Sequence, residues 1–228
     1  MVSDTNFLLV GNSRLHWAES FQNEYKFFHT EKNISIPKSF NISNLIWASV
    51  GDLSNLFLRE KNQIKTQDIK LENLPEYFGV DRALGCLAAL KTITNPYKKD
   101  LLIADFGTTL TLTKLTARGS IIGGQIAPGF RTQLRAMAHY TKNLNVPRAF
   151  DIPIPNFLIT TEDSMLKGVF NSLLGVINLS FNPRKDILII CGGDSNLMLS
   201  ELEKKNGEII NSPDLVMQGM IYHFQSLK

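Results

Sequence analysis

A short apolar run in this chain ends on a carboxylate, a glycine and two hydroxyls, and an alternating strand follows directly. Residues 101–115 read LLIADFGTTLTLTKL, which predicts a buried strand, a tight turn at Gly107 and a returning strand. Glycine lets the backbone approach a ligand closely, so the turn can offer N–H groups and hydroxyls to phosphate while Asp105 faces a cation. The pattern also fits a β-hairpin whose Asp and Thr side chains only satisfy hydrogen bonds of the turn.

A second copy of this pattern begins near the amino terminus. Residues 7–17 (FLLVGNSRLHW) align with residues 103–113 (IADFGTTLTLT) without a gap, so that Gly11 meets Gly107 and Ser13 meets Thr109. Two such hairpins predict a duplicated α/β unit whose two turns face each other across a cleft, each holding one end of a polyphosphate. In the first copy Leu9 takes the place of Asp105.

Composition excludes several classes of protein. The 228 residues are 43% hydrophobic and 20% charged, as in an ordinary globular protein of one large domain or two small ones. The net charge of +3 is spread along the chain, which gives no reason to expect nucleic acid. No membrane span or secretion signal is recognisable, so we expect a cytosolic protein without a membrane partner. Cys86 and Cys191 lack the spacing of a metal site and are expected to be reduced core thiols.

Hydrophobic periodicity predicts an alternation of strands and helices. The predicted strands comprise residues 7–10, 14–20, 25–30, 45–51, the two strands of the 101–115 hairpin, a strand within 121–129 that breaks into a loop at its glycines and proline, 186–191 and a short one at 209–210. The predicted helices comprise residues 52–62, 81–91, 130–144, 165–181, 195–204 and 215–224. Residues 65–74 are expected to form a weak strand or a loop, and the proline-rich residues 145–157 a loop or lid. Small residues dominate the 81–91 helix, which suggests close packing against a sheet or against another copy of itself.

Neither a P-loop nor a dinucleotide-binding glycine motif occurs in the sequence, so its phosphate-binding loops are of another kind. Five short motifs occur in a characteristic order: Gly11-Asn12-Ser13, Gly79-Val80-Asp81-Arg82, Asp105-Phe106-Gly107-Thr108, the GGQIAPG segment at residues 123–129, and Gly192-Gly193-Asp194. In this order they closely resemble the type III pantothenate kinases, which belong to the actin-like, acetate kinase and hexokinase superfamily. The resemblance covers nearly the whole chain.

The resemblance implies an α/β protein with the actin-like ATPase fold, built from two duplicated RNase H-like halves with mixed sheets. The halves are expected at residues 1–100 and 101–228, with the last helix a candidate to pack back on the first half. The resemblance further implies a homodimer that binds pantothenate at its interface.

The resemblance also assigns roles to individual residues. Asp81 matches the proton acceptor of the family, and Asp105 matches a monovalent-cation ligand. The expected pantothenate contacts are Gly79, Val80, Asp81, Arg82 and Thr161. The expected ATP contacts are Leu9, Val10, Gly11, Asn12, Ser13, Arg14, Leu15, His16 and Thr108.

An enzyme of this family would transfer the γ-phosphoryl group of ATP to the primary alcohol of pantothenate, the first step toward coenzyme A. The reaction would need Mg2+ and either K+ or NH4+. Phosphoryl transfer has a loose transition state, so the protein must mainly align the alcohol and spread charge through cations and backbone donors. Two glycine–hydroxyl turns and a few carboxylates are sufficient for this task.

Each assigned residue also has a simpler interpretation. Asp81 and Thr161 can serve only as helix caps, Arg82 only as a surface charge, and His16 as an ordinary hairpin side chain. The family normally has an Asp at the position of Leu9. It also has a tyrosine before the Gly79–Arg82 motif, and Tyr77 lies too close to this motif to be that residue. Two rival functions therefore stay open: a non-catalytic regulatory or accessory relative, and a kinase of the same superfamily that acts on another small alcohol.

Overall fold

A computed structural model of the chain describes residues 5–22, 24–32, 36–37, 40, 42–53, 58–95 and 98–227. Within these ranges no helix combines the length and the apolar character needed to cross a membrane. The chain divides into two compact units. One unit comprises the described residues of Met1–Thr94 with Gly119–Ile121 and Asp214–Lys228, and the other comprises Asn95–Arg118 and Ile122–Pro213.

The first unit is built on a four-stranded sheet in the order β3-β2-β1-β4. Its strands are β1 (Phe7–Val10), β2 (Arg14–Phe21), β3 (Glu24–Glu31) and β4 (Ile46–Ser49). The first three strands form an antiparallel meander, and β4 pairs with β1 in parallel. One face of the sheet carries a buried cluster that includes Leu8, Leu15 and Trp17, because alternate residues of a strand point to the same face.

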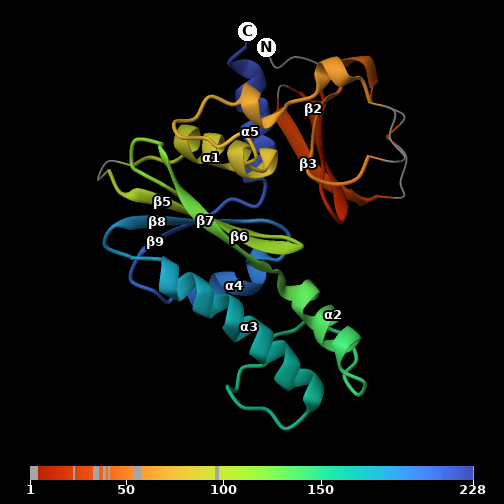
Figure 1. Cartoon of the computed structure of the whole chain (residues 1–228), viewed down its shortest axis with the longest axis vertical. Helices are drawn as coiled ribbons and strands as arrows, with labels where there is room; N and C mark the ends of the chain where they lie inside the picture. The colour runs from red at the N-terminus through yellow and green to blue at the C-terminus, as the bar shows by residue number, and fades with distance from the viewer. Residues whose placement is uncertain are drawn as a thin grey trace. The chain divides into compact units, whose positions relative to one another are not determined.

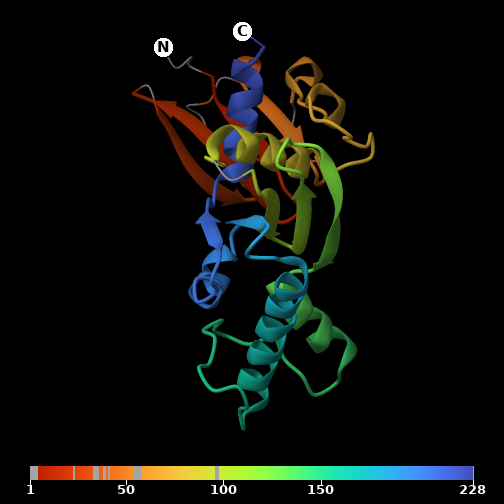
Figure 2. The same cartoon turned by 90° about the vertical axis from the view of Figure 1, so that its left-hand side faces the viewer.

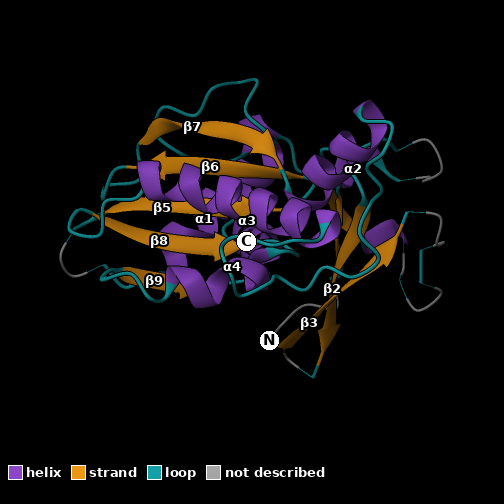
Figure 3. Ribbon diagram, turned by 90° about the horizontal axis from the view of Figure 1, so that it is seen from below, coloured by secondary structure: helices purple, strands orange, loops and turns teal. Residues whose placement is uncertain are grey.

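The second unit is built on a five-stranded sheet in the order β7-β6-β5-β8-β9, whose strands lie side by side in Figure 3. Its strands are β5 (Asp100–Phe106), β6 (Thr109–Leu115), β7 (Ile121–Pro128), β8 (Asp186–Cys191) and β9 (Glu208–Asn211). β5 pairs antiparallel with β6 and in parallel with β8. β8 is buried along its whole length, as expected of a strand covered on both faces.

The two sheets repeat one topology, which confirms the predicted duplication. In each sheet the first strand lies between an antiparallel hairpin partner and a parallel strand from later in the chain. The gapless alignment of the two hairpins is wrong, however. Val10 pairs with Leu15 whereas Phe106 pairs with Leu110, so the first turn is one residue longer.

This one-residue difference follows from the hydrophobic pattern. Leu15 and Trp17 are buried in the first hairpin, as are Leu110 and Leu112 in the second. Side chains of a strand alternate between its two faces, so a register shifted by one residue would expose these four apolar side chains. The apolar pattern therefore fixes the register of each hairpin.

In the first unit, helices α1 (Val80–Thr92) and α5 (Leu215–Gln225) pack on each other and appear side by side in Figure 2. A Cβ atom on Gly219 would overlap the carbonyl group of Leu84, so this close approach requires glycine there. The small residues of α1 thus serve contact with α5. The suggested packing of α1 against another copy of the chain stays a prediction.

In the second unit, helices α2 (Phe130–Tyr140), α3 (Thr161–Ser180) and α4 (Ser195–Leu202) share one buried core with β5, β6 and β8. α3 and α4 lie on the same face of the sheet (Figure 1). The side chain of Thr160 accepts a hydrogen bond from the N–H of Asp163, so it caps α3. The sequence predicted this helix from residue 165, and the structure begins it one turn earlier, at Thr161.

Two predicted helices differ from the structure. Of the predicted helix at residues 52–62, only Glu60–Asn62 is helical among the described residues, as a single 3-10 turn, and residues 54–57 lie outside them. The predicted helix at residues 130–144 ends at Tyr140. Directly after Tyr140 come Thr141, Lys142 and Asn143, three exposed polar residues that cannot extend the buried face of α2.

Candidate functional site

The Asp81 carboxylate lies in the first turn of α1. Gly79 occupies the N-cap position and the helix begins at Val80, so the interpretation of Asp81 as the N-cap is wrong. Oδ1 of Asp81 accepts a hydrogen bond from the N–H of Arg82 at 2.7 Å. This bond uses one carboxylate oxygen and fixes the orientation of the side chain.

Burial raises the pKa of Asp81, while the hydrogen bond from the Arg82 N–H and the charge of Arg82 oppose the rise. A carboxylate with a raised pKa accepts a proton more readily near neutral pH than an exposed one does. Perturbed carboxyl groups of this kind concentrate at functional sites. Asp81 is therefore chemically suited to the predicted role of proton acceptor.

Arg82 is held beside Asp81 by an aromatic ring. Its guanidinium carbon lies 4.1 Å from the centre of the Phe78 ring, and burial lowers the pKa of the guanidinium. The hydroxyl of Thr66 donates to the Phe78 carbonyl at 2.7 Å, which fixes the segment that leads into α1. A stacked, half-buried arginine is well placed to bind a carboxylate, which fits the predicted pantothenate contact better than a surface charge does.

Three other residues around this helix start have distinct environments. Val80 is buried, so its side chain belongs to the core. Tyr77 is 92% exposed. Cys86 lies one turn after Arg82, and burial raises the pKa of its thiol to about 12. Cys86 is therefore a core thiol as predicted, and Cys191 is also buried.

The first glycine turn follows β1. The N–H of Gly11 donates to the carbonyl of Arg14 at 3.0 Å, so Asn12 and Ser13 form the tip of the turn and are exposed. Leu9, Val10 and Leu15 are 6%, 0% and 1% exposed. Of the predicted ATP contacts, Asn12, Ser13 and Arg14 therefore present exposed side chains, whereas the leucines and Val10 are core residues.

His16 lies next to this turn. Burial lowers its pKa to about 4, with further contributions from His29 and Arg14. The ring is therefore neutral at pH 7. The rings of His16 and His29 face each other across paired strands, with centroids 6.4 Å apart.

The second glycine turn is tighter. The N–H of Gly107 donates to the carbonyl of Thr109 at 3.0 Å, which leaves Thr108 alone at the tip. Asp105 lies beside Cys191 of the parallel strand β8. Asp105 and Thr108 thus come together at the ends of two parallel strands, the position at which α/β sheets bind ligands.

Two glycine segments pack against this turn from different elements. A Cβ atom on Gly192, which has φ +85°, would overlap Oδ1 of Asp105. A Cβ atom on Gly129 would overlap the carbonyl oxygen of Gly107, and the N–H of Gly129 donates to the Thr108 carbonyl at 3.0 Å. The glycines of the two motifs are therefore required by the packing of backbone around the Asp105 turn.

The structure adds two residues that the sequence did not single out at this turn. The hydroxyl of Thr132 donates to the Thr108 carbonyl at 2.6 Å, and Nε of Arg131 lies 3.4 Å from Oδ1 of Asp194. Asp194 belonged to a recognised motif but carried no predicted role. In the sequence, only the position of Arg131, two residues after the end of the 123–129 motif, could have indicated that it lies near this turn.

Thr161 is the first residue of α3, and the cap of that helix is Thr160. Thr161 is exposed, and the interpretation of Thr161 as the cap is wrong. α3 begins away from the five-stranded sheet and runs toward it (Figures 1 and 2). The start of α3, where Thr161 lies, is thus the end of the helix farther from the sheet.

The carboxylate of Asp105 is suited to a cation that has other ligands besides this protein's carboxylates. Among the described residues, no group of three or more His, Cys, Asp or Glu side chains could hold a metal ion. Mg2+ commonly uses one or two carboxylates together with the phosphates of a nucleotide and water. The single carboxylate of Asp105 fits a cation that is bound chiefly through such phosphates.

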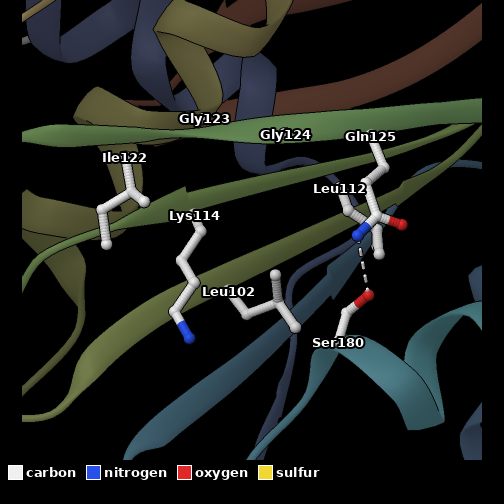
Figure 4. A pocket seen from close by; sticks show the side chains of 8 residues that line it. All are labelled: Leu102, Leu112, Lys114, Ile122, Gly123, Gly124, Gln125 and Ser180. Atoms are coloured by element: carbon white, nitrogen blue, oxygen red, sulfur yellow. Dashed lines mark hydrogen bonds between the residues drawn. The ribbon is translucent and has the colours of Figure 1, made fainter.

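A cavity of about 200 Å³ lies elsewhere on the second unit. Figure 4 shows its lining, in which the Gln125 amide donates to the Ser180 hydroxyl at 3.2 Å. Lys114 also lines the cavity, but its Nζ lies 2.9 Å from the fully buried carboxylate of Asp186. This cavity shares no residue with the predicted site.

Comparison with known proteins identifies relatives. A family model described as type III pantothenate kinase matches residues 33–182. A type III pantothenate kinase from Gloeobacter violaceus is 34% identical over 202 residues, which cover 82% of this chain and 84% of that protein. One from Synechocystis sp. is 26% identical over 234 residues, which cover 95% of this chain and 89% of that protein.

Solved structures share the fold. A protein from Campylobacter jejuni described as a Baf family transcriptional activator has a TM-score of 0.68 at 18% identity, covering 97% of this chain and 98% of that one. An activator of 2-hydroxyisocaproyl-CoA dehydratase from Clostridium difficile, solved with ADPNP, has a TM-score of 0.58 at 12% identity and covers 97% and 94%. The duplicated sheets and these likenesses identify the actin-like ATPase and sugar kinase fold.

Proposed function

The chain belongs to the type III pantothenate kinase family, and from this premise we propose that it transfers the γ-phosphoryl group of ATP to the primary alcohol of pantothenate. The product is 4'-phosphopantothenate, and the reaction is the first step of coenzyme A biosynthesis. The observation that carries the proposal is the Asp81 carboxylate, which is oriented by the Arg82 N–H and has a pKa raised by burial.

The chemical step places Asp81 beside the hydroxyl of pantothenate. The hydroxyl oxygen forms a bond to the γ-phosphorus, the bond from that phosphorus to the bridging oxygen breaks, and ADP leaves. Asp81 orients the alcohol and accepts its proton late in the step, since the alcohol is a far weaker acid than a carboxylic acid. Arg82 binds the carboxylate of pantothenate through its guanidinium, and Gly79, Val80 and Thr161 remain assigned to the same substrate.

The nucleotide is assigned to the segment from Leu9 to His16 and to Thr108. The N–H of Gly11 is used within the turn by the Arg14 carbonyl, so the exposed tip residues Asn12 and Ser13 carry the polar groups proposed to bind phosphate. The side chains of Leu9, Val10 and Leu15 are buried, so their contribution is to hold the backbone of the turn.

Cations complete the proposal. Asp105 is the proposed ligand of K+ or NH4+, and Mg2+ is bound mainly by the phosphates of ATP. When bound, these cations neutralise the charge that develops on the transferred group. The proposal also includes a cytosolic location, supported by two buried cysteines, since thiols stay reduced in that compartment.

We further propose that the enzyme is a homodimer, as the resemblance implies. Support comes from apolar side chains that are more than four-fifths exposed near the end of α2, in the following loop and at the start of α3. These are Tyr140, Ile154, Phe157 and Ile159. Such a concentration of exposed apolar residues is typical of a surface that a protein partner covers.

A direct assay tests the activity. Purified protein is incubated with ATP, Mg2+ and K+ and with pantothenate or a panel of other small alcohols, and products are identified by mass spectrometry. We expect phosphopantothenate. A product from another alcohol alone would identify a kinase of the superfamily with a different substrate.

One observation favours a second candidate, a non-catalytic accessory homologue. Leu9 is a buried aliphatic residue where the resemblance implies a carboxylate near the phosphates. Absence of every phosphorylated product, with ATP binding retained, would support this candidate.

A further inference from the structure

Arg131 and Asp194 form a bridge between two elements of the second unit. Arg131 is the second residue of α2, and Asp194 directly precedes α4. Nε of Arg131 lies 3.4 Å from Oδ1 of Asp194. The guanidinium carbon also lies 4.3 Å from the centre of the Phe150 ring. The guanidinium is thus held by a carboxylate and an aromatic ring.

Groups at or next to both residues form hydrogen bonds with the backbone of the Asp105 turn. The N–H of Asp194 donates to the Phe106 carbonyl at 3.0 Å. The Thr132 hydroxyl, next to Arg131, donates to the Thr108 carbonyl at 2.6 Å. The bridge therefore joins two segments that are each bonded to the turn assigned to ATP.

The residues around the Asp105 turn carry more negative than positive charge, which is unfavourable for binding the phosphates of a nucleotide. The turn and the two segments that pack on it comprise residues 105–109, 128–132 and 192–195. Within them the acidic side chains are Asp105 and Asp194, and the one cationic side chain is Arg131. Phosphate groups beside two carboxylates need a compensating cation, and a guanidinium binds phosphate oxygens through paired N–H groups.

The bridge to Asp194 leaves most of the guanidinium's binding capacity unused. It uses the Nε–H, and the guanidinium has four further N–H donors on its two Nη atoms. The Arg131 side chain is 43% exposed, so solvent and a ligand can reach it. An ion pair this exposed contributes little to stability, which makes a purely structural role a weak explanation.

We propose that Arg131 binds the phosphate groups of a nucleotide at the Asp105 turn, and that Asp194 and Phe150 are positioning residues that hold its guanidinium. The inference rests on the proposed function, because it takes ATP as the ligand of that turn. It assigns to Arg131 the charge compensation that a lysine supplies in a P-loop.

Binding of adenosine, ADP and ATP to Arg131→Gln, measured by calorimetry in the presence of Mg2+, tests the proposal. We expect ADP and ATP affinity to fall about 10- to 100-fold, the usual effect of losing a hydrogen bond to a charged group. Adenosine has no phosphate, so its affinity should change less than about twofold. Arg131→Lys should restore part of the loss, because it keeps the charge without the planar fork.

Arg184→Gln is the matched control. Arg184 is exposed and lies just before β8, at the opposite end of the parallel strands from the Asp105 turn. The same change of charge there should leave the affinities for adenosine, ADP and ATP unaltered. Unchanged ATP affinity in Arg131→Gln overturns the inference, as does an equal loss for adenosine and ATP. If the wild type binds ATP but makes no phosphopantothenate, the proposed function fails, and the binding series still decides the role of Arg131.

Discussion

The carboxylate of Asp105 packs directly against the backbone of Gly192, so closely that a Cβ atom on Gly192 would overlap Oδ1. Gly192 also has φ +85°, a conformation that side-chain-bearing residues rarely adopt. Gly192→Ala must therefore displace Asp105 or strain the backbone. We expect a loss of about 1–3 kcal/mol in the free energy of unfolding, together with a weaker response of the rate to K+.

The control is Gly168→Ala in α3, where a Cβ atom would meet nothing within 4 Å. That variant should be as stable as the wild type or more stable, since alanine favours a helix over glycine by about 1 kcal/mol. Denaturant unfolding and K+ titration of the rate measure both effects. A Gly192→Ala protein with wild-type stability and K+ response would contradict the packing argument.

Asp81→Asn should retain affinity for pantothenate and lose rate by about 10²- to 10⁴-fold, the usual contribution of a positioned general base. The wild-type rate should rise with pH as Asp81 loses its proton, with a midpoint above 3.8 because burial raises its pKa. This acid limb should be absent in Asp81→Asn. Initial rates at several pH values and calorimetric binding of pantothenate provide the measurements.

Glu72→Gln, an exposed carboxylate in the same unit, is the control for Asp81→Asn and should behave as the wild type. Turnover of Asp81→Asn at the wild-type rate would show that Asp81 has no part in proton transfer.

Leu9→Asp should lower the Mg2+ concentration needed for half-maximal rate. Leu9 is 6% exposed and pairs with His16 across the hairpin, so a carboxylate there is desolvated and favours a nearby cation. The measurement is initial rate against Mg2+ at saturating ATP and pantothenate. Leu9→Asn has similar size without the charge and should not reproduce the effect. Activity that appears only in Leu9→Asp would favour the non-catalytic candidate for the natural chain.

The stability of the protein should fall as the pH falls from about 6.5 to about 4, because of His16. Its pKa is lowered from 6.5 to about 4 in the folded state, so in this window the unfolded chain binds more protons. The stability associated with neutral His16 is complete above 6.5 and is lost as the pH falls toward the folded-state pKa. In urea unfolding, the free energy of unfolding of His16→Gln should depend less steeply on pH than that of the wild type. Identical slopes for the wild type and His16→Gln would refute this origin.

Light scattering at micromolar concentration should give twice the chain mass of 25.6 kDa. Phe157→Asp should shift the mass toward the monomer, since a charge at an apolar interface is desolvated without a partner. Tyr77→Asp alters an equally exposed aromatic residue of the first unit and should leave the mass unchanged. A wild-type mass of one chain at all concentrations would rule out the dimer.

Much of the site was predictable because it is local. The two glycine turns and the Gly79–Arg82 helix start each lie within a few consecutive residues, and each motif has the local structure that its residues favour. The buried state of Cys86 and Cys191 followed equally from their apolar surroundings. Sequence also led to the family, through the order of the motifs.

Other features were beyond the sequence because they depend on contacts between distant residues. Arg131 and Asp194 are 63 positions apart, and neither has a local pattern that indicates the other. The alternation of Leu15 and Trp17 was visible, but the extra residue of the first turn emerged only from the observed strand pairing.

Most strands, the positions of the glycine turns and the starts of several helices followed from the sequence alone, because hydrophobic periodicity and the backbone preferences of glycine act over a few residues. The tertiary structure decided which surfaces these elements cover. The small residues of α1 suggested packing against a sheet or a second copy, and the structure shows α5 on them because Gly219 allows its backbone to reach Leu84. Such a choice depends on the complementary shape of two segments far apart in the chain, which no local pattern encodes.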